Sequence, residues 1–189
     1  MEQKDIYIET ERIIIRNFKP KDVIGLLEYL SRPRVNCFVG DRLYSEESAL
    51  TYMFHSSKKM LHYAVCLQED DFIIGDVFAV REYTDTYSVG WHFNQRFEGK
   101  GFAYEAATGL LDYLFREAGA RRIYGFVEDD NIRSKRLCER LGMRYEGCFK
   151  EFVTFINNPD GSPKYEDTCV YAILKKEWNS IRTKSITNN

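Results

Sequence analysis

The fold is decided by one stretch, which reads Asn94-Gln95-Arg96-Phe97-Glu98-Gly99-Lys100-Gly101-Phe102-Ala103-Tyr104-Glu105-Ala106. Residues 87–93 before it form an aromatic, β-like run, and after it apolar residues recur at helical spacing as far as Phe115. The two glycines let the backbone approach a ligand closely, because they carry no Cβ. The first N–H groups of a helix lack partners inside the helix, and the helix dipole favours anions at that end. The stretch therefore predicts a phosphate cradle between a strand and a helix.

Two better-known phosphate loops do not fit this stretch. A Walker loop needs Ser or Thr after its Gly-Lys pair, where this chain has Gly101. The dinucleotide-binding fingerprint needs Gly at its sixth position, where this chain has Tyr104. The predicted cradle therefore belongs to neither of these nucleotide-binding classes.

The composition is that of one soluble domain. The chain has 189 residues, of which 44% are hydrophobic and 30% charged. We expect the domain to cover residues 1–180, followed by a polar tail at 181–189 that is frayed from Thr183 on. A net charge of −2 provides no basic field that would attract nucleic acid. No run of about 18 apolar residues is present to cross a membrane, and the first five residues are too polar for a signal peptide. We expect neither a nucleic-acid partner nor a membrane partner.

The cysteines indicate a reducing, cytoplasmic setting. They are odd in number and scattered singly, at Cys37, Cys66, Cys138, Cys148 and Cys169. No Cys-x-x-Cys pair occurs, and the three histidines do not complete a zinc pattern, so we expect no metal site. Cysteines inside apolar segments are typical of small buried hydrophobic residues, and a nucleophilic cysteine is the less favoured interpretation.

Working outward from the turn, the pattern predicts one α+β domain. Residues 62–67, 72–80 and 87–93 read as three strands joined by short turns, hence as an antiparallel meander. The helix after Gly99 is expected to end at Gly119. The other expected elements are a strand at 13–16, a helix from Pro20 to Leu30, a helix from Ser45 towards Met60, a strand at 121–127, a short helix capped by Asn131 and closed by Gly142, and a hairpin of 149–156 with 168–174 around 157–161.

A second stretch, residues 127–147, carries the resemblance to a known family. The glycine turn fits the pattern Arg/Gln-x-x-Gly-x-Gly/Ala, which is typical of the pyrophosphate loop of the GNAT superfamily of acyl-CoA-dependent N-acyltransferases. Residues 127–147 resemble that superfamily's segment with Asn and Ser three apart, followed by Gly-Phe and a later Gly. The matching positions are Arg96, Gly99 and Gly101 in the turn and Asn131, Ser134, Gly142, Met143 and Gly147 in the second stretch.

Met143 departs from that segment, since the family carries an aromatic residue there. Further matches are Ile74-Gly75-Asp76, Val89-Gly90-Trp91 and the ending at residues 167–174. Together these segments resemble the Rim-like branch, whose known members acetylate protein N-termini, and the resemblance runs from about Thr10 to Trp178. It implies the GNAT fold, a mixed, mostly antiparallel sheet of about seven strands flanked by helices.

The resemblance also implies acetyl-CoA as co-substrate and a set of residues that bind it. In the family, the strand before the loop separates from the next strand, and the pantetheine arm inserts between them. A backbone N–H there that faces the developing oxyanion would contribute about 2.7–4 kcal/mol. The implied coenzyme-binding residues are Trp91, His92, Phe93, Arg96, Gly99, Lys100, Gly101, Phe102, Ala103, Asn131 and Ser134.

Several of these roles have an alternative. Asn131 either contacts the pantetheine arm or only caps a helix. Ser134, the candidate catalytic residue, either donates to the departing sulfur or is an exposed helix serine. Arg133 and Lys135 either reach the 3′-phosphate or lie on a solvated helix face.

The general base is unassigned from sequence. A protein α-amine has a pKa near 8, against about 10.4 for lysine, so an α-amine needs less help to lose its proton. No spacing argument separates the candidates, which are Asp76, Glu82, Asp85, His92, Glu128 and Asp129.

The acceptor is also open. A peptide α-amine is the first hypothesis, a small amine such as a polyamine, amino acid or aminoglycoside is the second, and a non-catalytic acyl-CoA-binding module is the third. Residues 32–62 and 155–165 would decide between them. Acidic side chains that would attract a cationic acceptor are Asp41, Glu46, Glu47, Asp160, Glu166 and Asp167. Dimers are common in the family, so a homodimer is an expectation that the sequence leaves untested.

Overall fold

The computed structural model describes residues 5–54 and 60–187, with side chains described as far as Thr183. No helix in these two ranges has both the length and the apolar character needed to cross a membrane. In chain order the elements are β1 (Tyr7–Glu9), β2 (Ile13–Arg16), η1 (Pro20–Asp22), α1 (Val23–Leu30), η2 (Asn36–Asp41), α2 (Glu46–Phe54), β3 (Met60–Leu67), β4 (Ile73–Arg81), β5 (Thr86–Phe93), η3 (Gln95–Phe97), α3 (Phe102–Arg116), β6 (Arg122–Glu128), α4 (Ile132–Arg140), β7 (Arg144–Asn157), β8 (Pro163–Leu174) and α5 (Lys175–Thr187).

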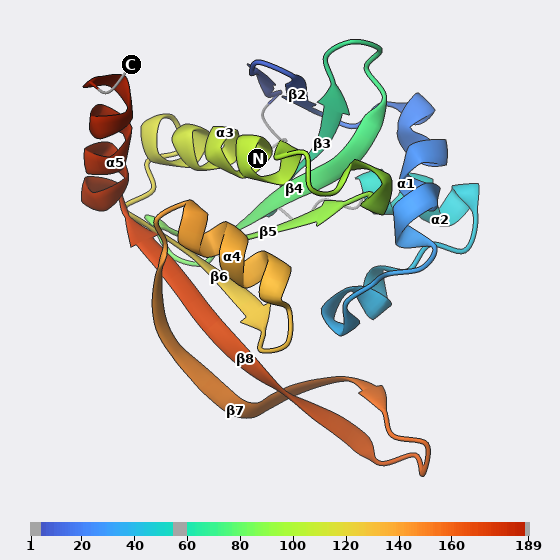
Figure 1. The fold of residues 1–189 in the computed structure, drawn as a ribbon. Coiled ribbons are helices and arrows are strands. Elements are labelled where there is room, and N and C mark those ends of the chain that lie inside the picture. The colour runs from blue at the N-terminus through green and yellow to red at the C-terminus, as the bar shows by residue number, and fades with distance from the viewer. Residues whose placement is uncertain (1–4, 55–59, 188–189) are drawn as a thin grey trace.

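The strands form one open, twisted sheet in the order β1-β2-β3-β4-β5-β6-β8-β7 (Figure 1). Neighbouring strands are antiparallel except β5 and β6, which are parallel because α3 connects them. Helices α3, α4 and α5 supply apolar side chains to the core on one face of the sheet, and α1 and α2 supply those on the other face. The α+β fold class expected from the sequence is confirmed.

The principal core forms because α3 presents a continuous apolar face to the sheet. Its residues Leu110, Leu111, Leu114 and Phe115 are fully buried, at the helical spacing seen in the sequence. They pack against strand side chains such as Val77, from the middle of the sheet. This packing fixes the N-terminus of α3, and with it the glycine turn, at the end of β5.

The sheet is incomplete between β5 and β6. These strands share three residue pairs, Thr86 with Arg122, Tyr87 with Ile123 and Ser88 with Tyr124. Beyond them, β5 stays paired with β4 as far as Phe93, while β6 stays paired with β8 as far as Glu128. The separation of these two strands, expected from the family resemblance, is therefore present in the fold.

Two elements differ from the sequence-based expectation. The sheet has eight strands rather than about seven, because the three-residue strand β1 pairs with β2 at the edge. The C-terminal segment is helical through Thr187, so the prediction of a frayed tail from Thr183 on is wrong for residues 183–187. This helix is held because Trp178 is buried against Phe115, Ile181 packs on the core, and Arg182 pairs with Asp112 at 3.0 Å.

The remaining predicted elements are present with shifted ends. Helix α2 begins after Ser45, whose hydroxyl accepts the N–H of Ser48 at 3.2 Å, but its predicted continuation over residues 55–59 lies outside the described residues. Helix α3 ends at Arg116, before Gly119 turns the chain with φ +74°. The hairpin strands β7 and β8 are longer than predicted, and Figure 1 shows them reaching well beyond the rest of the sheet.

Candidate active site

The glycine turn has the backbone geometry of an anion cradle. Gly99 and Gly101 have φ +77° and +85°, values that side chains other than glycine rarely adopt, and Gly101 directly precedes α3. The N–H of Glu105 donates to the Gly101 carbonyl at 3.1 Å, so the N–H groups of residues 102–104 belong to the unpaired first turn of the helix. These donors and the helix dipole suit a pyrophosphate.

On one side, the turn is held in place by the side chain of Arg12. Its Nη1 donates to the Lys100 carbonyl at 2.9 Å, and its Nε donates to Glu105 at 2.8 Å. The Glu105 carboxylate also accepts the Thr10 hydroxyl at 2.6 Å. The only carboxylate in the first turn of α3 is therefore neutralised by Arg12, which leaves the helix N-terminus attractive to anions.

On the other side, the turn is held by Glu28 of α1. One Glu28 oxygen accepts from Asn94 Nδ2 at 2.9 Å and from Arg96 Nη1 at 3.0 Å. The Arg96 side chain is 71% exposed, and an anion bound in the turn would compete with Glu28 for its guanidinium. Lys100 lies over the Phe97 ring, 5.6 Å from its centre, and leaves its charge at the surface beside the turn.

The gap between β5 and β6 offers unpaired backbone to a ligand. The N–H of Asn94 donates to Ile74 of β4, and residues along a strand alternate in the direction of their N–H groups. The N–H groups of Trp91 and Phe93 therefore face away from β4, into the gap. Their side chains pack against the core on the α3 face. This arrangement fits the expectation that an extended pantetheine arm lies there as an additional strand.

At the start of α4, Asn131 acts as the N-cap. Its Oδ1 accepts the N–H of Ser134 at 3.1 Å, and Ser134 is half-buried in the first turn. Arg133 pairs with Glu98 of the glycine turn, and Lys135 Nζ lies 2.6 Å from Asp129. Both cations are thus held in ion pairs rather than directed at a phosphate.

Glu98 joins three elements at the mouth of the gap. Its second oxygen accepts from Arg34 Nη1 at 2.9 Å, so one carboxylate bridges Arg34 before η2 and Arg133 of α4. A bound phosphate would compete with Glu98 for Arg133, since both are anions on the same guanidinium.

A buried cluster around Asp76 lies on the α1–α2 face of β4 and β5. Asp76 is 0% exposed, and its carboxylate meets four side chains from four different elements. The contacts are Tyr29 OH at 2.7 Å, Tyr52 OH at 3.2 Å, His62 Nε2 at 2.9 Å and His92 Nδ1 at 2.8 Å. Burial alone would raise the pKa of Asp76, but the charges and hydrogen bonds of His92 and His62 lower it well below its ordinary value. The cluster therefore keeps Asp76 ionised inside the protein.

The η2 segment crosses the gap on this same face. The N–H groups of Asn36 and Cys37 donate to Glu128 at the end of β6, and Phe38 lies edge-on to the His92 ring at 3.7 Å between centres. A cavity of about 400 Å³ beside the start of η2 is lined by residues 34–36, by Glu128 and by residues 130–133 and 136 at the start of α4. A larger cavity of about 670 Å³ runs along α3 towards β1 and reaches the turn only at Gly101.

The contacts in the structure distinguish the six candidate bases from one another. Asp76 and His92 are in contact, and Glu128 anchors η2. The other three are engaged elsewhere: Glu82 accepts from Ser88, Asp85 pairs with Arg121, and Asp129 pairs with Lys135, which lowers the pKa of Asp129.

The acidic residues expected to attract an acceptor are mostly used within the chain. Glu166 accepts from Asn36 Nδ2 at 2.5 Å, Asp167 pairs with Lys150, and Asp160 accepts from Ser162 in the hairpin turn. Glu46 and Glu47 are exposed in the first turn of α2. Asp41 lies at the end of η2, where partial desolvation raises its pKa, the charge of His92 lowers it, and that of Asp76 raises it further.

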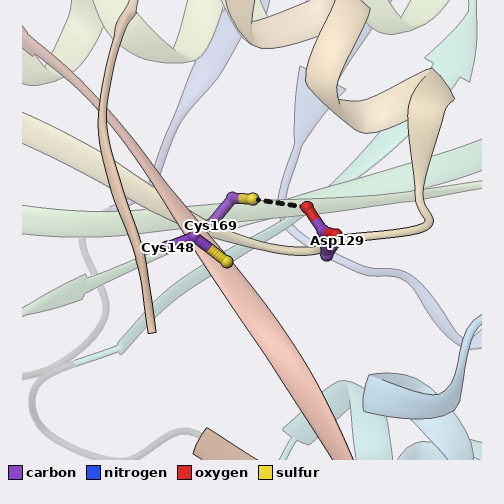
Figure 2. A group of neighbouring side chains, drawn as sticks. All are labelled: Asp129, Cys148 and Cys169. Carbon is purple, nitrogen blue, oxygen red and sulfur yellow. Dashed lines mark hydrogen bonds between the residues drawn. The ribbon is translucent and has the colours of Figure 1, made fainter. Parts of the chain in front are cut away.

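Three side chains from β7, β8 and the residues before α4 form a group of possible metal ligands, where the sequence pattern predicted none. The Sγ atoms of Cys148 and Cys169 and an oxygen of Asp129 all lie within 4.8 Å of one another (Figure 2). The two cysteines are opposite each other on β7 and β8, a pairing that their wide spacing in the sequence conceals. Asp129 already accepts from Cys169 Sγ at 3.1 Å and from Lys135, and burial raises the pKa of Cys169 to about 11. These contacts satisfy the carboxylate without an ion.

Several residues that shape the site were not predicted. Arg12 and Glu28 fix the turn, and His62, Tyr29 and Tyr52 surround Asp76. Arg12 directly precedes β2 and the others come from α1, α2 and β3, all distant in the sequence from both recognisable stretches.

Comparison with known proteins gives consistent matches. The family model of the acetyltransferase (GNAT) domain matches residues 12–144. The uncharacterized N-acetyltransferase YnaD of Bacillus subtilis (strain 168) is 34% identical over 176 residues, which cover 92% of this chain and 100% of that protein. The ribosomal protein uS5-alanine N-acetyltransferase of Escherichia coli (strain K12) is 22% identical over 192 residues, covering 94% and 95% of the two chains. The crystal structure of a GNAT-family acetyltransferase from Bacillus anthracis has a TM-score of 0.79 at 31% identity, covering 91% of this chain and 100% of that one.

Proposed function

The chain belongs to the GNAT family of acetyltransferases, and from this premise we propose that it transfers an acetyl group from acetyl-CoA to the α-amine of a protein or peptide N-terminus. N-acetyltransferase activity of the GNAT type is the family's reaction, and acetyl-CoA is its donor. The observation that carries the proposal is the gap between β5 and β6, which has at one end a helix N-terminus suited to phosphate and, on the opposite face, the η2 crossing.

The residues fit the coenzyme in three places. The pyrophosphate would accept from the first N–H groups of α3, with Arg96 and Lys100 adding positive charge. The pantetheine arm would pair with the free backbone of Trp91 and Phe93 in the gap. Asn131 uses its oxygen as the helix cap, which leaves its Nδ2 to donate to a pantetheine carbonyl, and the hydroxyl of Ser134 would donate to the departing sulfur.

A peptide α-amine is favoured as the acceptor for two reasons. One relative that matches over nearly its whole length is named a ribosomal protein uS5-alanine N-acetyltransferase, so its acceptor is an alanine of a protein. The protruding β7–β8 hairpin and η2 flank the face of the gap away from α3, where an extended chain end would enter. A small amine is the alternative, since the cavity of about 400 Å³ at this place also suits a compact molecule.

The test incubates the protein with acetyl-CoA and a pool of peptides with varied N-termini, polyamines and aminoglycosides, followed by mass spectrometry. Acetylation at a peptide α-amine, lost when that amine is blocked, is the expected result. Acetylation confined to small amines would replace the peptide acceptor with the alternative. Coenzyme binding without any product would favour the non-catalytic module.

Two further expectations accompany the proposal. Free cysteines suit a reducing compartment, which supports a cytoplasmic protein. A homodimer stays a prediction, and light scattering at several protein concentrations measures it directly.

A further inference from the structure

We propose that Nε2 of His92 is the general base of the reaction, accepting a proton from the acceptor ammonium, and that Asp76 positions the imidazole for this step. The inference rests on the proposed acetyl transfer and names the residue that sequence patterns leave unassigned. Three observations support it: the contacts of the His92 ring, its place beside the gap, and the hydrogen bonds that the competing carboxylates already accept.

The hydrogen bonds fix which ring nitrogen carries the proton. Asp76 is ionised and can only accept, so His92 Nδ1, at 2.8 Å, must donate to it. In a neutral imidazole the other nitrogen, Nε2, is then left with a free lone pair. The His92 residue is only 6% exposed, and within the described part of the chain its Nε2 is buried and has no hydrogen-bond partner. A buried polar atom without a partner is uncommon and calls for an explanation. An acceptor ammonium that donates its proton to Nε2 would supply the missing partner.

The position of His92 on β5 suits this role. Its neighbours Trp91 and Phe93 turn their N–H groups into the gap where the thioester would lie, whereas the His92 side chain projects onto the α1–α2 face. That face is opposite to α3 and α4, whose N-termini form the coenzyme side. Phe38 of η2 lies against the His92 ring, so an amine that enters from the η2 side would reach Nε2 as Phe38 moves aside.

The other groups facing this histidine are arranged to hold it rather than to compete with it. Tyr29 comes from α1, Tyr52 from α2, and His62 from β3, and each is bonded to the Asp76 carboxylate. Asp41 of η2 adds a nearby negative charge. The strongest rival base is Glu128, but its two oxygens already accept the N–H groups of Asn36 and Cys37, so it serves as the anchor of η2.

The step balances with one base. His92 Nε2 takes one proton from the acceptor ammonium, and the freed amine lone pair forms the C–N bond to the thioester carbonyl carbon. As the C–S bond breaks, the Ser134 hydroxyl gives its proton to the departing thiolate and takes the second proton of the nitrogen in its place. The imidazolium returns its proton to solvent, so each turnover releases one proton.

The test compares three variants on a peptide acceptor with a free N-terminal α-amine that the wild-type protein acetylates. His92→Asn keeps a donor near the Nδ1 position for Asp76 but removes the base, and should lower kcat/KM at pH 7 by about 100-fold or more. His62→Gln removes the other ring from the same carboxylate, two strands from the gap, and should cost less than about five-fold. Glu128→Gln removes the negative charge of Glu128, the rival candidate for the general base. Coenzyme-induced stabilisation, measured by thermal melting, should persist in His92→Asn.

Two conditions separate a base from a merely structural residue. Near pH 9.5 a peptide α-amine is already neutral, and an aminooxyacetyl peptide is neutral at pH 7. The His92→Asn deficit should shrink by about ten-fold or more in both cases, because the first proton no longer needs removal.

Three results would overturn the assignment: activity of His92→Asn within about three-fold of wild type, a deficit that is the same under all conditions, or the base-like pattern in Glu128→Gln instead. A wild-type protein that acetylates no acceptor would remove the proposed function itself, a distinct failure. If His92→Asn does not fold, ¹⁵N NMR of the wild-type histidines decides: a protonated Nδ1 and bare Nε2 at His92 are expected, and the reverse tautomer contradicts the proposal.

Discussion

Gly101→Glu tests whether the turn before α3 binds the coenzyme phosphates. Gly101 has φ +85°, and a non-glycine residue in this left-handed region costs about 1–2 kcal/mol. For a chain of 189 residues, each kcal/mol corresponds to roughly 2–4 °C in Tm, so the variant should melt about 2–8 °C lower than wild type. The added carboxylate would also occupy the helix N-terminus that the pyrophosphate needs.

The binding defect is then read from coenzyme-induced stabilisation. CoA at about 100 times its Kd stabilises a protein by about 2.7 kcal/mol, which is roughly 5–10 °C here. This shift should appear in wild type and vanish in Gly101→Glu. Scanning calorimetry with reductant present measures both effects.

Gly119→Glu is the matched control for strain and charge. Gly119 has φ +74°, and a Cβ there meets no atom within 4 Å, but it lies at the opposite end of α3. It should lose similar stability and keep the full CoA shift. A full CoA shift in Gly101→Glu, or its loss in both variants, would refute the placement of the phosphates in the turn.

Three further changes have definite expected outcomes. Trp178→Ala should destabilise the protein by about 3–5 kcal/mol in urea unfolding, since this side chain of α5 is 2% exposed; a loss under about 1 kcal/mol would show that α5 is dispensable. Glu98→Gln should lower the Kd for CoA about two- to five-fold by calorimetry, because it frees Arg133 and removes an anion from the turn; unchanged or weaker affinity would contradict this. Burial would raise the pKa of Asp71, but hydrogen bonds from Lys21 and Arg16 lower it well below its ordinary value. The stability that Asp71 contributes is therefore present above about pH 4 and is lost as the pH falls further. Asp71→Asn should therefore be less stable than wild type at pH 7 and differ least at the acid end of a urea series; a difference that does not depend on pH would exclude this linkage.

Local patterns were sufficient for most of the fold because they reflect short-range physics. The apolar face of α3 and the cap at Asn131 follow from spacing and residue type alone. Strand β1 has three residues and exists only through its pairing with β2, so no periodicity marks it. Helix α5 is polar in composition, and its stability comes from Trp178 and Ile181 docking on the core, a contact that composition does not reveal.

The site could be predicted only in part, since its chemistry depends on strand register. Asp76 and His92 were both recognisable as candidates, yet their contact was not. Counting equal numbers of residues outward from the turn at Thr84 would have placed them opposite each other, as they are in β4 and β5. Tyr29 and Tyr52 reach Asp76 from helices packed over the sheet, and no pattern in the sequence sets that packing.

The three residue pairs between β5 and β6 have a mechanical consequence. The strands β1 to β5 form one hydrogen-bonded half of the sheet and β6, β8 and β7 form the other, and the two halves are joined only at one end of β5 and β6. An extended ligand lying between them would act as an additional strand that joins the two halves into one continuous sheet. Its effect should spread beyond its contacts: amide hydrogen exchange would slow at Trp91 and Phe93 and also along the facing edge of β6. The coenzyme would thus stiffen the sheet as a whole, and its release would loosen the entrance that the acceptor uses.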